Sequence, residues 1–221
     1  MKILASTIAA AAIFTSAGAA AASVQVQLWN FTSAGSQLSA NETTYAGLGS
    51  ASYTFTYSGP IDWSTSAATN TFLDFIGVAN EPFVSGLSLV QDAALDATKL
   101  SSSGAANQSF FRITGNYYSS GPGTGTITHD DGAGIFFDGL KIDAMTTNQE
   151  GWTSSVVGTF NKPSLGNHTF ALDYVEGNGS PSVLRFAGGA VPEPTTWAMM
   201  LVGFTGLGAI LRRRRMSAFA A

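Results

Sequence analysis

Residues 125–139 read GTITHDDGAGIFFDG, and this stretch indicates the class of fold. Residues 125–129 and 134–137 have the β-branched and aromatic composition of strands. The run Asp130-Asp131-Gly132 between them is typical of a connecting loop, because aspartate and glycine favour turns. Asp138-Gly139 is a dipeptide favoured in two-residue hairpins, and a short strand at 140–142 follows it. The stretch predicts antiparallel β-structure.

Strand patterns continue on both sides of this stretch. Between 83 and 100 the pattern is weaker, and residues 91–100 are predicted to form one or two helical turns. Residues 32–50 and 176–180 are predicted to be loops, because they are rich in glycine and small polar residues. The remaining predicted strands are 24–31, 52–58, 70–78, 110–118, 153–160, 167–174 and 182–186. About 168 residues lie between the two chain ends described below, which is enough for one domain, so we predict an all-β fold with a single β-sandwich or barrel.

Composition excludes several classes of function. The 221 residues contain no cysteine, which rules out disulfides, cysteine-ligated zinc and thiol catalysis. Residues 23–190 contain five basic and thirteen acidic side chains, a net charge of −8 that the four arginines at 212–215 hide in the whole-chain value of −4. An acidic domain without a basic cluster does not suit nucleic acid, but it is compatible with a bound cation.

The amino terminus has the three parts of a secretory signal peptide. Lys2 supplies a positive charge, residues 3–17 are apolar, and Ala20-Ala21-Ala22 is an A-x-A type cleavage site. We expect residues 1–22 to be removed during export. The domain is then expected to span residues 23–187, followed by a linker at 188–191. A retained amino-terminal anchor is the alternative, although such a helix would be short and rich in alanine.

Residues 192–215, PEPTTWAMMLVGFTGLGAILRRRR, combine a Pro-Glu-Pro sequence, an uncharged apolar run and four arginines. The run at about 195–211 predicts one transmembrane helix, slightly shorter than a full span. By the positive-inside rule the arginines lie on the cytoplasmic side, which leaves the domain outside the cytoplasm. Residues 216–221 form a short tail.

This carboxyl-terminal segment resembles the PEP-CTERM sorting signal in its PEPxxWA form. The resemblance implies export by the Sec machinery, transient anchoring in the inner membrane, recognition by an exosortase, and delivery to the cell surface or biofilm matrix. The host implied is a Gram-negative bacterium that makes extracellular polysaccharide. An ordinary carboxyl-terminal anchor is the alternative. The matching residues are Pro192, Glu193, Pro194, Trp197, Arg212, Arg213, Arg214 and Arg215.

Within the domain, FFRITG at 110–115, the opening stretch at 125–139 and LGNHTFALDYVEG at 165–177 together resemble PA14-like domains. The likeness is clearest over residues 107–187. It implies a twisted β-sandwich that binds carbohydrate or partner proteins. In the adhesin branch of that family, two consecutive aspartates joined by a cis peptide hold a Ca²⁺ ion that binds sugar hydroxyls.

Asp130 and Asp131 stand at the positions of those two aspartates, and the resemblance suggests Asn178 or Glu176 as the source of further oxygens. Calcium takes six to eight oxygen ligands, which carboxylates, amides, carbonyls and sugar hydroxyls can supply together. The alternative is a structural loop in which the aspartates accept backbone N–H groups.

Other side chains near these segments could have either a role at a binding site or a structural role. Trp63 and Trp152 are placed in loops or at strand ends and are the candidates for stacking on a sugar ring, although core or edge packing is the favoured interpretation of each. His129 either lines the site or faces solvent at the end of a strand. His168 matches a family position that packs against or caps a turn. Asp138 is better explained by the hairpin than by chemistry.

No sequence motif of a known enzyme class is present, so we expect a protein that is not an enzyme. We predict an exported surface or matrix protein that binds extracellular polysaccharide, with Ca²⁺ as the ion that assists. The rival functions are a matrix protein without a ligand and a carbohydrate-active enzyme that uses a pair of carboxylates.

Overall fold

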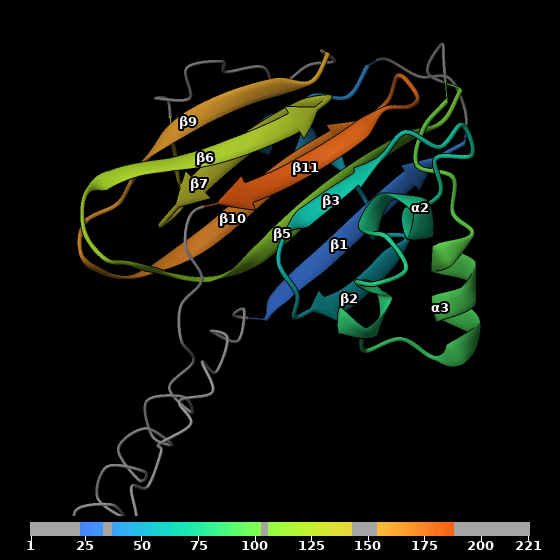
Figure 1. Cartoon of the computed structure of the whole chain (residues 1–221), viewed down its shortest axis with the longest axis horizontal. Helices are drawn as coiled ribbons and strands as arrows, with labels where there is room; N and C mark the ends of the chain where they lie inside the picture. Colours follow the sequence, from blue (N-terminus) through green and yellow to red (C-terminus); the bar gives the residue numbers. More distant parts are fainter. Residues whose placement is uncertain (1–22, 33–36, 103–105, 143–153, 188–221) are drawn as a thin grey trace, which may run out of the picture.

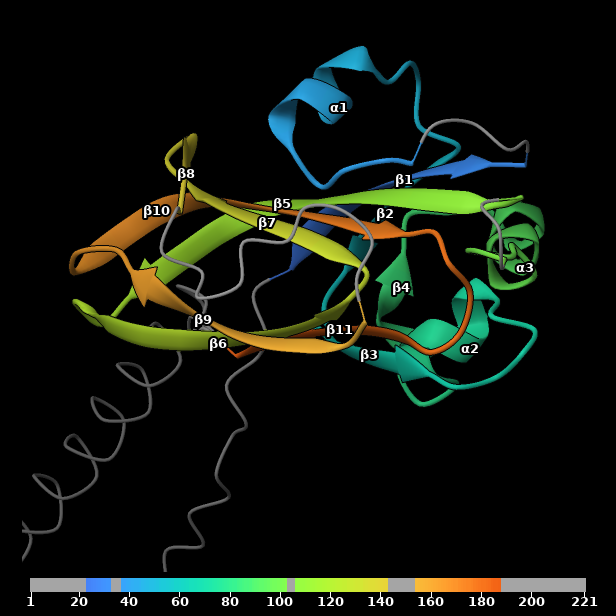
Figure 2. The same ribbon diagram turned by 90° about the horizontal axis from the view of Figure 1, so that it is seen from above.

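The computed structural model describes residues 23–32, 37–102, 106–142 and 154–187. Within them the strands form two antiparallel sheets that face each other as a sandwich (Figures 1 and 2). One sheet has the order β4-β2-β1-β5-β10-β7-β8 and the other the order β3-β11-β6-β9. The strands are β1 (Val24–Phe31), β2 (Tyr53–Tyr57), β3 (Asp62–Thr65), β4 (Val84–Ser85), β5 (Gln108–Ser119), β6 (Gly123–Asp130), β7 (Gly132–Phe137), β8 (Leu140–Lys141), β9 (Val156–Lys162), β10 (Gly166–Glu176) and β11 (Ser182–Ala187). This confirms the predicted all-β sandwich.

The main core lies between the two sheets and is rich in aromatic rings. Strand β1 contributes alternate residues to it, including Val26 and Leu28, which are fully buried. Phe75 and Tyr174 stack at 5.6 Å between ring centroids, and Phe111 packs against both of them. Burial of such large apolar side chains is the main stabilising contribution to a domain that has no disulfides.

A second, smaller core lies on the outer face of the seven-stranded sheet. Residues 37–51, which include helix α1 (Glu42–Gly47), cross this face and cover it (Figure 2). Trp29 lies beneath them, 5% exposed, with its ring against Tyr45 and Phe110. Its indole N–H donates to the carbonyl of Gly49 at 2.8 Å. Part of the sheet is therefore buried on both faces, which explains the apolar side chains on both faces of β1.

Two predicted segments differ from the structure. Residues 70–78, predicted as a strand, contain helix α2 (Phe72–Ile76), because Thr71 and Asp74 form a reciprocal capping box at its start. The loop predicted at 32–50 contains α1, which Asn41 caps by accepting a hydrogen bond from the backbone N–H of Thr44. The helical turns predicted within 91–100 are present as α3 (Leu89–Asp96), which begins two residues earlier. A 3-10 turn, η1 (Glu81–Phe83), lies between α2 and α3.

The predicted hairpin at Asp138-Gly139 is confirmed. Both residues have positive φ, 53° and 75°, as a type I′ turn requires. Asp138 also fixes the neighbouring strand, because its carboxylate accepts from the backbone N–H of Thr169 and lies 2.6 Å from Nδ1 of His168. The Asp138 carboxylate raises the pKa of His168 through this hydrogen bond. His168 thus caps a turn, one of the roles that the sequence suggested.

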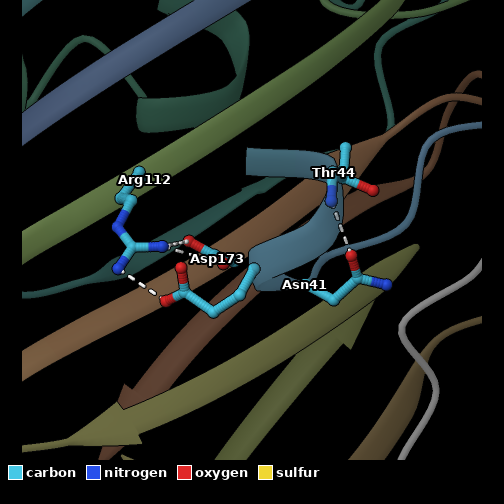
Figure 3. A network of polar contacts seen from close by, with 5 residues as sticks. Asn41, Thr44, Arg112 and Asp173 are labelled. Atoms are coloured by element: carbon cyan, nitrogen blue, oxygen red, sulfur yellow. Dashed lines mark hydrogen bonds and ion pairs between the residues drawn. The ribbon is translucent and has the colours of Figure 1, made fainter. Parts of the chain in front are cut away.

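A buried ion pair ties α1 to the sheet. Arg112 of β5 lies 3.3 Å from Asp173 of β10 and 2.7 Å from Glu42 of α1, and its guanidinium stacks 3.9 Å from the ring centre of Tyr45. Figure 3 shows the bond from Arg112 to Asp173 beside the Asn41–Thr44 cap. Asp173 is fully buried. Burial raises its pKa to about 7, since the charge of Arg112 compensates only in part and Glu42 adds a like charge.

The raised pKa of Asp173 leads us to expect an unusual dependence of the free energy of unfolding on pH. Its pKa in the folded state lies above its pKa in the unfolded chain, so folding favours the protonated form. The stabilisation that protonated Asp173 contributes is complete below about pH 4 and is lost as the pH rises towards 7. Over this range the free energy of unfolding should fall by up to about 1.4 kcal/mol per pH unit. Asp173→Asn should remove this slope. Urea unfolding of both proteins between pH 4 and 8 tests this, and equal slopes would contradict it.

The described residues contain no helix long and apolar enough to cross a membrane. The predicted signal peptide at 1–22 and the predicted membrane helix at 195–211 lie outside the residues that the structure describes.

Candidate functional site

The chain passes between the two sheets at two neighbouring places. Strand β6 of one sheet leads through Asp130-Asp131 into β7 of the other, and β10 leads through residues 177–181 back to β11 (Figure 2). The strand register brings these passages together, because Asp130 pairs with Val183 of β11 and Gly132 pairs with Val175 of β10. We call these two connections the sheet crossing. The peptide bond between Asp130 and Asp131 is cis, the arrangement that the PA14 resemblance implied.

Asp131 joins the two connections of the sheet crossing. It is fully buried, and its Oδ2 accepts hydrogen bonds from the backbone N–H groups of Gly177 at 2.8 Å and Asn178 at 3.1 Å. One oxygen of Asp131 therefore has the structural role that we considered as the alternative, although it holds the neighbouring loop rather than its own.

Glu176 lies beneath the crossing in a polar network. It is fully buried, with Oε1 2.6 Å from the Ser101 hydroxyl and Oε2 2.8 Å from the Tyr174 hydroxyl. Tyr174 also bonds to the main-chain oxygen of Asp130. Burial, with the charge of Asp131, raises the pKa of Glu176 to about 8. Glu176 is thus neutral at pH 7 and can donate to Tyr174, whose single proton then goes to Asp130.

This arrangement does not support the predicted role of Glu176 as a metal ligand, because both of its oxygens are engaged away from solvent. The sequence analysis also missed Tyr174, Ser101 and Asn70, which complete the network: the Asn70 amide donates to the Ser101 hydroxyl at 2.6 Å. One signal was available. Tyr174 and Glu176 are two residues apart on a strand, so their side chains point to the same face of the sheet.

Asp130 is slightly more exposed to solvent than Asp131. It is 4% exposed, and burial and the nearby charge of Asp131 raise its pKa to about 6. In the described part of the chain it forms no ion pair with lysine or arginine. Two buried carboxyl groups in adjoining residues form a site where a cation would be stabilised.

The donor atoms around the crossing suit calcium better than zinc. They are the carboxylate oxygens of Asp130 and Asp131, together with the amide of Asn178, an exposed residue whose backbone N–H bonds to Asp131. Among the described residues no three His, Cys, Asp or Glu side chains converge as a metal centre. A Ca²⁺ ion here would therefore need an amide, carbonyls, water or sugar hydroxyls to complete its coordination. Asp130, Asp131 and Asn178 remain predicted ligands.

His129 neither faces solvent nor lines an open site. It is fully buried, and its Nδ1 lies 2.6 Å from the main-chain oxygen of Asp131. Burial lowers the pKa of His129. The neutral ring donates to Asp131 and so supports the turn of the crossing from inside.

The prediction that Trp63 stacks on a sugar is wrong. Trp63 lies in β3, where alternation turns its neighbours Asp62 and Ser64 outward and Trp63 into the core. Its side chain is fully buried, and its ring packs against those of Tyr57 at 5.0 Å and Phe75 at 5.7 Å. The short strand β3 was not predicted, so the sequence placed Trp63 only in a loop or at a strand end. The other predicted sugar-stacking residue, Trp152, lies outside the described residues.

Comparison with known proteins bears on both parts of the chain. Residues 190–215 match the PEP-CTERM protein-sorting motif, which includes all eight residues predicted for the signal although they lie outside the described structure. A search of curated proteins finds no match.

Among solved structures, the PA14 sugar-binding domain from an RTX adhesin aligns with a TM-score of 0.51 and 20% identity, over 77% of this chain and 93% of the other. The PA14 domain of the MpAFP antifreeze protein aligns with a TM-score of 0.49 and 18% identity, over 77% and 83%. The chain thus joins a domain with the PA14 fold to a PEP-CTERM sorting motif.

Proposed function

We propose that this protein is displayed at the cell surface or in the extracellular matrix and binds carbohydrate through a Ca²⁺ ion at the sheet crossing. One observation carries the proposal. Asp130 and Asp131 place two adjoining carboxyl groups at the sheet crossing, and burial, with the nearby charge of Asp131, raises the pKa of Asp130 to about 6. A divalent cation would compensate the negative charges of these buried carboxylates.

The residues of the sheet crossing would have different roles at such a site. The carboxylates of Asp130 and Asp131 would hold the ion, and Oδ2 of Asp131 also fixes the backbone at Gly177 and Asn178. Asn178 is thereby held beside the aspartates with its side chain exposed. The bound ion would supply open coordination positions for a pair of sugar hydroxyls. The similarity in fold to a domain described as sugar-binding supports this assignment.

Sorting and binding fit together in this proposal. The motif at 190–215 indicates export and a membrane-anchored sorting signal, and we propose that an exosortase processes it. Delivery into a layer of extracellular polysaccharide would place the sheet crossing beside its ligand. We propose binding rather than catalysis, because Glu176, whose pKa of about 8 would suit an acid catalyst, is sealed from solvent.

A glycan array probed with the purified protein tests the proposal. We expect binding to a subset of glycans in millimolar Ca²⁺, and loss of that binding in EDTA. Equal binding with and without EDTA would support a glycan site elsewhere on the domain. No binding in either condition would favour the rival function, a matrix protein in which Asp131 serves only to join the two loops.

A further inference from the structure

Helix α3 presents its apolar side to solvent. Leu89 and Val90 are 88% and 80% exposed, and Ala93 and Ala94 are also exposed. At 3.6 residues per turn these four side chains occupy one continuous arc of about 140°. Leu95 is the one fully buried residue of the helix. A surface helix normally turns its apolar arc inward, so this orientation requires an explanation.

The helix is fixed in this orientation. Ser88 and Gln91 form a reciprocal capping box at its start. Beyond its end, Phe72 donates its backbone N–H to the Thr98 carbonyl at 2.8 Å, and Leu100 donates its backbone N–H to the Asn70 carbonyl at 2.9 Å. Leu95 and Leu100, both fully buried, attach the segment to the main core. The apolar arc cannot turn inward without breaking these contacts.

Carboxylates border the arc. Asp92 and Asp96 lie one turn apart along one side of α3, and Glu81 of η1 is close enough for its charge to act on Asp96. Among the described residues none of the three forms an ion pair. The surface therefore combines exposed aliphatic side chains with an uncompensated negative edge. We call it the α3 face: Leu89, Val90, Ala93 and Ala94 with Asp92 and Asp96.

The negative charge of the α3 face limits which kind of molecule could bind to it. Bacterial lipid surfaces and acidic polysaccharides are negative and would be repelled. A second copy of the chain packed face to face would bring two sets of aspartates together, and their like charges would repel. A helix with leucine or isoleucine on one side and lysine or arginine beside them would match both features. The small side chains of Ala93 and Ala94 would let such a helix approach closely.

We propose that the α3 face is a docking surface for a basic amphipathic helix of a partner protein. This surface is separate from the sheet crossing, since none of its residues belongs to the polar network or to the proposed calcium ligands. Carbohydrate binding and partner binding are therefore tested by separate experiments, and the failure of one leaves the other standing.

A synthetic amphipathic peptide of roughly 20 residues, with leucine on one face and lysine on the other, is a suitable probe, because shorter helices are marginal in water. We expect saturable binding to the full chain by fluorescence anisotropy, weakened at least about tenfold by Val90→Glu. Val157→Glu on β9 is the matched control, since Val157 is 68% exposed and belongs to a different surface. Asp92→Asn with Asp96→Asn should weaken binding and reduce its dependence on salt.

Four results would overturn the proposal. The first is equal weakening by Val157→Glu, which would show non-specific attraction. The second is equal affinity for a peptide in which glutamate replaces every lysine. The third is binding of the α3 face to anionic vesicles. The fourth is dimerisation in sedimentation experiments that Val90→Glu abolishes. Circular dichroism of each variant would establish that it is folded, which both exposed positions should permit.

Discussion

Trp63→Ala is expected to lower the free energy of unfolding by about 3–5 kcal/mol, the usual range for removing a fully buried aromatic side chain. The loss is large because Trp63 has no solvent exposure and contacts the rings of Tyr57, Phe75 and Phe111. The surrounding rings belong to the seven-stranded sheet and to helix α2, so they cannot close the cavity easily. Chemical denaturation with fluorescence or circular dichroism measures the effect.

Trp63→Phe should cost less than the alanine substitution, because it keeps part of the ring contact. Tyr118→Ala is a suitable control, since Tyr118 is 41% exposed and its removal should change stability little. A Trp63→Ala protein of unchanged stability that no longer bound glycan would contradict the assignment of this residue to the core and restore its role at a binding site.

Asp130→Asn combined with Asp131→Asn is expected to abolish calcium-dependent glycan binding while the fold is retained. Asparagine keeps the shape of each side chain, and its carbonyl oxygen can still accept from the backbone N–H groups of Gly177 and Asn178. The double substitution removes both charges, so the affinity for Ca²⁺ should fall at least about 100-fold. Titration of Ca²⁺ and of the glycans identified on the array measures both effects.

Stability in EDTA separates this account from a purely structural role of the two aspartates. We expect the double variant to be as stable as the original protein or more stable, because it removes the buried charge whose desolvation, with the nearby charge of Asp131, raises the pKa of Asp130. Asp62→Asn is the matched control, as Asp62 is an exposed aspartate paired with Arg185 away from the crossing. A strongly destabilised double variant, with no calcium effect in either protein, would favour the structural role.

The sandwich was predictable because alternation and turn residues are local signals. Val24–Phe31 was predicted to the residue, and the Asp138-Gly139 hairpin has the expected turn. The helix at 72–76 was missed because four of its five side chains are apolar, a run that also suits a buried strand; the capping residues Thr71 and Asp74 distinguish the two. Burial on both faces of a sheet, as at Trp29, depends on residues 37–51, which no local pattern places there.

The candidate site was predictable only in its central pair. Asp130 and Asp131 came from a family resemblance, and the backbone N–H of Asn178 bonds to Asp131, while the part of the Asn178 side chain as a ligand stays a prediction. The buried position of Glu176 could not be read from its loop-like neighbours, because it depends on Ser101, which lies 75 residues away. Trp63 was misplaced for a similar reason, since its strand exists only through pairing with β11. Contacts between distant segments decide such cases.

Thermal unfolding of the purified protein with increasing Ca²⁺ tests the central claim most directly. An ion held by Asp130 and Asp131 with an affinity typical of extracellular modules should stabilise the fold by about 1–3 kcal/mol at 10 mM Ca²⁺. The melting temperature should therefore rise in a saturable way, and the Asp130→Asn, Asp131→Asn variant should show no rise. A melting temperature of the original protein that is the same in EDTA and in 10 mM Ca²⁺ would contradict the account.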